Sequence, residues 1–329
     1  MTVVFTVVAV EVTSAMEPLG GHSATVGWDP GPRAQERLNA LFKRYRAGVG
    51  ACLEPIVRQY NPLMLEGEQD EYRKMLELSA KMNVVGHACA EIGGFDYDER
   101  RHMIGSLFGA CCFLADSFID DFGEEATRDY LERLGTLLTE GWFDPKTDRE
   151  RLFFVIAARL FAERDVLHPI VRQAVLQLYM AQKQDVELRA TRRDGRRLAR
   201  AQLNMLKRCA RNRSGHAILV LSAFVLPELR LDYLARMFWA GALIMYIDDH
   251  GDCWSDLKSN RLTFMNQVGN PERTLRRLFH AHIGQLASGL PDGDGRDLLI
   301  AFLTRYYLTR IEKHRQQRVK GASPWAIYE

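Results

Sequence analysis

A group of aspartates closes an apolar stretch in the first half of the sequence. Asp116, Asp120 and Asp121 stand near the carboxyl end of a helix predicted over residues 98–121. Carboxylates are disfavoured there because that end of a helix already carries partial negative charge. Asp116 and Asp120 are four positions apart and so share a helix face. Oxygen ligands alone suit a hard cation, and the pattern therefore predicts a magnesium site.

A second group of aspartates follows the apolar stretch 238–247. Asp248, Asp252 and Asp256 recur at every fourth position, so on one continuous helix the three side chains would point the same way. Like charges at this spacing repel one another, and more strongly beside an apolar pocket. A bound cation would remove that repulsion. Either group alone could be a solvated helix end, but two of them, each behind an apolar helical stretch, indicate cation binding.

Positive side chains that could bind a diphosphate occur in the stretches 206–215 and 304–318. Guanidinium groups match phosphate oxygens well, and several of these residues are expected to be ordinary surface residues. The cations of the two stretches include Lys207, Arg208, Arg211, Arg213, Arg305, Arg310, Lys313 and Arg315.

The composition limits the classes of function. Of the 329 residues, 47% are hydrophobic and 26% are charged, which is typical of a folded soluble protein. The net charge of +2 gives no reason to predict a nucleic-acid surface. The six cysteines include no CxxC pair, so neither structural zinc nor a disulfide framework is predicted. We therefore expect a cytoplasmic protein that does not bind nucleic acid.

The first part of the chain carries no helical period. Residues 1–31 are rich in glycine, proline and small side chains and are predicted to be a disordered or irregular leader. Its apolar stretch, Thr2 to Val12, is far shorter than the roughly 20 residues that cross a bilayer. Later apolar stretches are also too short, so no integral membrane association is expected.

The remainder, residues 32–329, is predicted to form one α-helical domain. Apolar side chains recur at helical spacing between breaks such as Asn61-Pro62 and Gly93-Gly94, and no alternating strand pattern stands out. This pattern predicts an all-α bundle around a common core. The predicted helices span 34–58, 67–92, 98–121, 124–140, 149–163, 170–191, 198–226, 231–250, 271–288 and 297–319.

The order of these motifs resembles that of class I terpene synthases, over about residues 85–320. They are members of the helical isoprenoid synthase superfamily, which also contains squalene and phytoene synthases and the chain-elongating prenyltransferases. In that family an aspartate-rich motif faces a second metal-binding motif, whose three steps are occupied here by Asp248, Asp252 and Asp256. The resemblance implies a single antiparallel helical bundle with a central active-site cavity.

Both metal-binding motifs depart from the common forms. In the second motif, aspartates replace the usual middle hydroxyl and final glutamate, and the first motif reads DxxxDD where DDxxD is common. These departures lean toward squalene-synthase-like members and toward bacterial synthases that resemble tetraprenyl-curcumene synthase.

The resemblance also implies roles for residues after the first motif. Class I cyclases carry a diphosphate-sensing arginine, followed by a linker residue and an effector carbonyl at a helix break. Arg211, Ser214 and Gly215 match that spacing, with serine in place of the usual aspartate linker. An arginine-tyrosine pair often covers the diphosphate near the C-terminus, and Arg305-Tyr306 is similar.

The implied reaction is magnesium-dependent cyclisation of a linear or bicyclic prenyl diphosphate, with C20 preferred to C15. Three magnesium ions would bridge the aspartates to the diphosphate, and a homodimer is common in the superfamily. The carbocation must be shielded from water and steered by aromatic faces. Candidate walls, although such aromatics are more often plain core, are Phe108, Phe113, Phe118, Trp239, Tyr246 and Phe302.

Three other functions compete with a terpene cyclase. Squalene and phytoene synthases join two prenyl diphosphates in the same fold, but only one clear basic subsite is visible in this sequence, which favours one substrate. A carboxylate-bridged di-iron bundle needs a second Glu-x-x-His pair beside Glu99 and His102, and none is found. A helical binding module without chemistry would release no diphosphate from any prenyl substrate.

Overall fold

The described part of the chain consists of helices and the loops between them. The computed structural model describes residues 30–121, 124–163, 169–190, 198–259 and 261–320, and these ranges contain no strand. The predicted all-α class is thus confirmed. None of the described helices combines the length and the apolar character that a membrane span needs. The elements are α1 (Gly31–Tyr60), α2 (Leu63–Glu66), α3 (Gln69–Ile92), α4 (Glu99–Asp121), α5 (Glu124–Glu140), α6 (Asp148–Ala162), α7 (Pro169–Ala190), α8 (Arg200–Val225), α9 (Leu231–Gly251), α10 (Cys253–Lys258), the 3₁₀ helix η1 (Met265–Gln267), α11 (Pro271–Gly289) and α12 (Asp294–Lys320).

All ten helices predicted from the sequence are found, with ends that differ by at most three positions. Local capping explains some of these ends. The Thr147 side chain accepts a hydrogen bond from the backbone N–H of Glu150 at the start of α6, at 3.2 Å. The Asn270 side chain caps α11 in the same way, directly before a proline in the first turn. The short helices α2 and α10 were not predicted.

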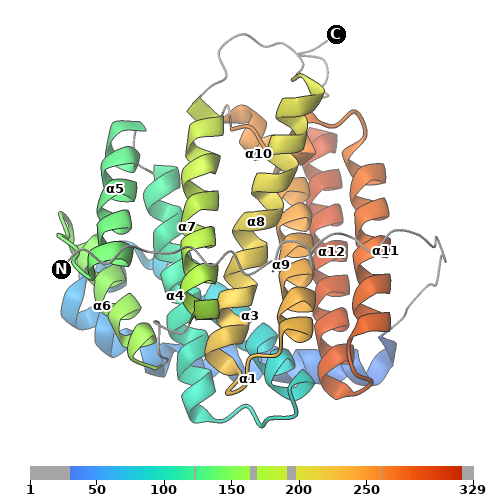
Figure 1. Ribbon diagram of the computed structural model, residues 1–329, viewed down its shortest axis with the longest axis horizontal. Coiled ribbons are helices and arrows are strands. Elements are labelled where there is room, and N and C mark those ends of the chain that lie inside the picture. Colours follow the sequence, from blue (N-terminus) through green and yellow to red (C-terminus); the bar gives the residue numbers. More distant parts are fainter. Residues whose placement is uncertain (1–29, 122–123, 164–168, 191–197, 260, 321–329) are drawn as a thin grey trace.

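The long helices from α3 to α12 stand side by side, and α1 lies across their base (Figure 1). Helix α9 packs against α8, α11 and α12, while α3 packs against α1, α4 and α12. The carboxyl ends of α4, α9 and α12 lie at the same end of the bundle, the upper end in Figure 1. This topology brings both aspartate groups, far apart in sequence, to one end of the molecule.

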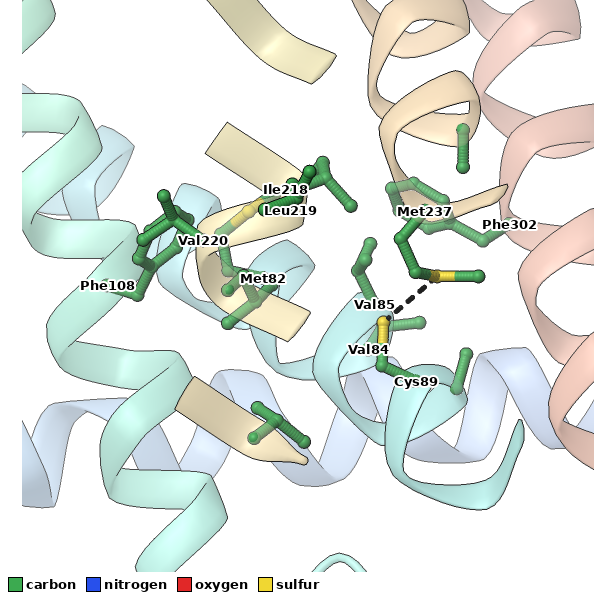
Figure 2. Close-up of a cluster of buried hydrophobic side chains, with 14 of the residues drawn as sticks. Met82, Val84, Val85, Cys89, Phe108, Ile218, Leu219, Val220, Met237 and Phe302 are labelled. Carbon is green, nitrogen blue, oxygen red and sulfur yellow. Dashed lines mark hydrogen bonds between the residues drawn. The ribbon is translucent and has the colours of Figure 1, made fainter. Parts of the chain in front are cut away.

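Apolar side chains from five helices fill the middle of the bundle. Figure 2 shows Met82 of α3, Phe108 of α4, Val220 of α8, Met237 of α9 and Phe302 of α12, all of which are buried. The bundle is packed at the level of these side chains. A hollow of about 480 Å³ lies between α5, α6 and α7.

Glycines allow α8 and α9 to approach each other closely. A Cβ added at Gly241 would lie 2.3 Å from the backbone oxygen of Ser214. We expect Gly241→Ala to lower the free energy of unfolding by about 1–3 kcal/mol, because backbone atoms cannot move aside cheaply. The matched control is Gly284→Ala in α11, where an added Cβ meets nothing within 4 Å. This substitution should raise the free energy of unfolding by about 0.5–1 kcal/mol, because alanine favours the helix more than glycine does. Urea unfolding measures both, and equal effects would contradict this account of the packing.

Candidate active site

The carboxylate of Asp116, near the end of α4, meets side chains from two other helices. Gln182 of α7 donates a hydrogen bond to Asp116 Oδ1 at 3.2 Å, and Arg213 of α8 donates one at 3.3 Å. The same guanidinium lies 3.0 Å from the carboxylate of Asp185, a buried residue of α7 that was not predicted. Arg213 therefore ties the end of α4 to α7 and α8.

Arg211, the arginine predicted to sense the diphosphate, lies on a different side of α8. Two positions along a helix correspond to about 200° of rotation, so Arg211 and Arg213 point in nearly opposite directions. The Arg211 guanidinium lies over the rings of Phe238 and Trp239, at 5.9 and 5.7 Å from their centres. The structure thus places Arg213, and not Arg211, beside the first acidic group.

Ser214 and Gly215 lie inside α8, which is continuous from Arg200 to Val225. The helix break expected for an effector carbonyl is therefore not present in this described stretch. A Cβ added at Gly215 would lie 2.5 Å from the ring of Phe238, so glycine at this position makes room for that ring. The roles of Ser214 and Gly215 as linker and effector stay predictions.

The first two aspartates of the second group face α12. Helix α9 ends directly before Asp252, which separates it from the short α10. Asp248 accepts a hydrogen bond from the Tyr306 hydroxyl at 2.5 Å and another from Arg310. Asp252 pairs with Lys313 and lies 3.6 Å from Arg310. Two carboxylates thus meet two cations and a phenol across the α9–α12 contact.

The partners on α12 form a stripe along one face of that helix. Tyr306, Arg310 and Lys313 are separated by four and three positions, which is the spacing of neighbours on a helix surface. Gly251 leaves room for the Arg310 side chain to reach Asp248, because a Cβ at Gly251 would lie 2.6 Å from Arg310 Cδ. Tyr306 and Arg310 have the same four-residue spacing as Asp248 and Asp252, and this match is the sequence signal that could have identified Arg310.

Arg305, the predicted partner of Tyr306, lies away from the aspartates. It is exposed, its guanidinium donates a hydrogen bond to Asn39 of α1 at 2.5 Å, and it lies over the ring of Phe42 at 5.3 Å. The structure therefore divides the predicted arginine-tyrosine pair. Tyr306 lies at the second acidic group, and Arg305 lies at the surface against α1.

Lys81 of α3 is a third cation at this end of the bundle, and it was not predicted. Its ammonium lies 5.6 Å from the centre of the Tyr306 ring. Burial lowers the pKa of Lys81, the positive charge of Arg310 lowers it further, and nearby carboxylates including Asp248 oppose both effects. Burial also raises the pKa of Tyr306 well above its usual range, so the phenol keeps the proton that it donates.

Asp256 lies apart from the other two aspartates of its group. It is buried in α10, 7% exposed, with its carboxylate 3.8 Å from Arg261. Asp249, buried nearby, has its pKa raised well above the usual range by burial and by the charge of Asp256, while the charge of Arg213 opposes this rise. The three predicted ligands thus have different partners, Arg261 for Asp256 and side chains of α12 for Asp248 and Asp252. The metal role of Asp256 stays a prediction.

The aspartates suit magnesium in their chemistry, although protein cations contact them. The side chains of Asp116, Asp248 and Asp252 are 48%, 36% and 29% exposed, so their oxygens remain accessible to an ion. Among the described residues, no three His, Cys, Asp or Glu side chains gather closely enough to hold a metal. The side chains of Asp120 and Asp121 lie outside the described ones. A magnesium ion would therefore have to share or replace the cationic partners of Asp248 and Asp252.

Three of the six predicted wall aromatics pack in two separate groups. Phe118 lies 4.6 Å from Tyr130 of α5, measured between ring centres. Trp239 and Tyr246 lie 5.4 and 6.0 Å from the ring of His282 in α11. Both groups are parts of the apolar core, and no shared wall follows from these contacts.

The other three aromatics also belong to the apolar core or pack against it. Phe108 is buried in the cluster of Figure 2, and Phe113 is partly buried against the core. Phe302 lies between Phe42 and Tyr306, at 6.2 and 6.0 Å, and so reaches the stripe on α12. A role of any of the six toward a substrate stays a prediction.

Comparison with known proteins identifies the fold of this chain but gives no sequence relative. No family model and no curated protein matches this chain. The structure is similar to that of a geranylgeranyl pyrophosphate synthetase from the archaeon Geoglobus acetivorans, with a TM-score of 0.51 and 12% identity over 83% of this chain and 99% of that one. A protein proposed to be a farnesyl-diphosphate synthase, from Marinomonas sp. MED121, gives a TM-score of 0.46 and 14% identity over 82% and 98%. The first likeness shows that this chain has the all-α isoprenoid synthase fold.

Proposed function

We propose that this chain is a magnesium-dependent class I terpene synthase, which ionises a prenyl diphosphate and cyclises the resulting carbocation. The carbon–oxygen bond to the diphosphate breaks, and its electron pair leaves with the diphosphate. The observation that carries the proposal is the contact of Asp248 and Asp252 with Arg310 and Lys313 at the end of the bundle. The fold supports this substrate class, because a protein of similar fold is named for the synthesis of a prenyl diphosphate.

The charges at this end of the bundle suit a diphosphate. Three cations, Lys81, Arg310 and Lys313, lie around the two carboxylates Asp248 and Asp252. This local excess of positive charge attracts an anion before any metal binds. Phosphate oxygens then become alternative partners for Arg310 and Lys313, which frees the carboxylates for a metal.

Asp116, Asp248 and Asp252 would hold magnesium, which when bound supplies Lewis-acid stabilisation of the leaving diphosphate. Asp120, Asp121 and Asp256 are further candidate ligands in this proposal. The protein's own cations act on the same developing charge, because Arg310 and Lys313 are already held in place by packing and ion pairs. Tyr306 keeps its proton and can donate it as a hydrogen bond to a phosphate oxygen.

A transfer reaction between two isoprenoid diphosphates is the second candidate function. The name of the Geoglobus acetivorans protein describes the synthesis of a prenyl chain, not its cyclisation. In such a reaction the carbocation would join a second isoprenoid molecule, so the product would contain more carbon atoms than the first substrate.

Product analysis distinguishes the two candidates. The protein is incubated with magnesium and the C20, C15 or C10 prenyl diphosphate, each alone and then with isopentenyl diphosphate, and the products are extracted. Extracts are analysed by gas chromatography and mass spectrometry, after phosphatase treatment where chain growth is sought. We expect a cyclic product with the carbon number of the substrate, with C20 tried first. A product with a larger or doubled carbon number would contradict the cyclase proposal and support the transferase.

A further inference from the structure

A second set of cations lies on the side of α9 that faces away from Asp248. Its members, three on α8 and one on α11, form what we call the α8/α11 cation group: Lys207, Arg208, Arg211 and Arg277. Arg211 lies over Trp239, which precedes Asp248 by nine positions on α9. Nine positions correspond to about 180° of rotation, so Trp239 and Asp248 lie on opposite faces. The thickness of α9 therefore separates this group from the proposed active site.

The α8/α11 cation group has no acidic counterpart in the part of the chain that the structure describes. None of its members forms an ion pair there with a carboxylate. Burial lowers the pKa of Lys207, and the charges of Arg277 and Arg211 lower it further. Burial likewise lowers the pKa of Arg211, with a further contribution from Arg208. Like charges held together in this way repel, and an anion would relieve that repulsion.

Rings and buried polar atoms lie beneath these cations. The Lys207 ammonium lies 5.7 Å from the centre of the Phe264 ring. His216 Nδ1 and His282 Nε2 are buried, and neither has a hydrogen-bond partner among the described residues. Burial lowers the pKa of both histidines to about 4, and the charges of Arg211 and Lys207 contribute to this. The histidines are thus neutral at pH 7, and the positive charge of the region comes from the lysine and the arginines.

We propose that the α8/α11 cation group binds a diphosphate anion at a site distinct from that at Asp248. The guanidinium groups can each donate two hydrogen bonds to phosphate oxygens, and the lysine adds a point charge. Diphosphate is favoured over a single carboxylate because its charge and number of oxygens match several cations at once. The site goes beyond the proposed function, since it requires neither magnesium nor turnover.

Calorimetric titration of the full-length protein with inorganic diphosphate tests this site. The titration is made in low salt with EDTA, so that no magnesium-dependent binding contributes. We expect Arg277→Gln and Lys207→Gln each to weaken binding by roughly tenfold, because each removes a charge-assisted hydrogen bond. Arg273→Gln is the matched control, as it removes an exposed arginine one turn earlier on α11 and should leave the affinity unchanged.

Two further measurements locate the bound anion. Arg310→Gln should weaken diphosphate binding at the Asp248 site and leave a second, magnesium-free binding event at the α8/α11 cation group, because Arg310 belongs to the other side of α9. Trp239 should report binding by fluorescence, and Trp239→Phe should remove that response while calorimetric binding remains. The proposal is overturned if the wild-type protein binds no diphosphate, or if Arg310→Gln abolishes binding that Arg277→Gln leaves intact. Geranyl diphosphate should bind with an affinity similar to that of inorganic diphosphate, because the rings beneath the cations are buried and do not contact the prenyl chain. Binding of geranyl diphosphate without binding of inorganic diphosphate would also overturn the proposal.

Discussion

Replacing Asp248 with asparagine should lower turnover of a prenyl diphosphate by roughly 10²- to 10³-fold. The amide keeps the shape of the side chain but carries no negative charge, so it is a poor magnesium ligand. It also leaves Arg310 and Tyr306 without the carboxylate that accepts their hydrogen bonds. Steady-state release of diphosphate, measured with saturating magnesium and the best substrate, gives the loss.

Asp232→Asn provides the matched control for that variant. Asp232 lies in the first turn of the same helix, and its side chain is 61% exposed beside Arg230. It should turn over substrate at the wild-type rate, and circular dichroism should show both variants folded. Wild-type turnover by a folded Asp248→Asn protein would contradict the assignment of the second acidic group.

Arg310→Gln should reduce turnover on the order of 10²-fold. Its guanidinium is the cation that contacts both Asp248 and Asp252, so it is placed to stabilise charge on a leaving diphosphate. Glutamine keeps much of the length but loses the charge and the paired donors. The same diphosphate-release assay measures the effect.

The controls for this variant lie on the same helix. Arg315→Gln removes an exposed arginine that pairs with Glu272 at 2.6 Å, and it should leave turnover unchanged. Arg305→Gln addresses the choice made from sequence, since Arg305 contacts Asn39 and not the aspartates. A larger loss with Arg305→Gln than with Arg310→Gln would contradict the structural assignment and restore the one based on sequence.

The long helices could be predicted because two strong patterns coincide along the chain. Apolar residues recur at helical spacing, and glycine and proline mark the ends. The short helix α10 has too few residues, six, for such a pattern to emerge. The spacing of the three aspartates also did not reveal that Asp256 is buried against Arg261, whereas Asp248 and Asp252 meet α12.

The site could be predicted only in part, for a physical reason that concerns side-chain direction. Aspartates at the end of an apolar helix stand out in sequence, because they conflict with the helix dipole. Arginines do not stand out, and two positions decide whether a guanidinium meets Asp185 or lies over Trp239, as Arg213 and Arg211 do. Which face of α8 turns inward depends on its packing against α7 and α9. In the same way, the packing of α12 decides that Arg310 meets the aspartates and that Arg305 lies against α1.

The most direct test of the proposed function is the release of inorganic diphosphate by the wild-type protein from a single prenyl diphosphate, with magnesium and then with EDTA. We predict release from the C20 or the C15 substrate that requires magnesium and stops when the metal is removed. Release that is indifferent to magnesium, or no release from any of the C10, C15 and C20 substrates by folded protein, would contradict the proposal that these acidic groups ionise a prenyl diphosphate.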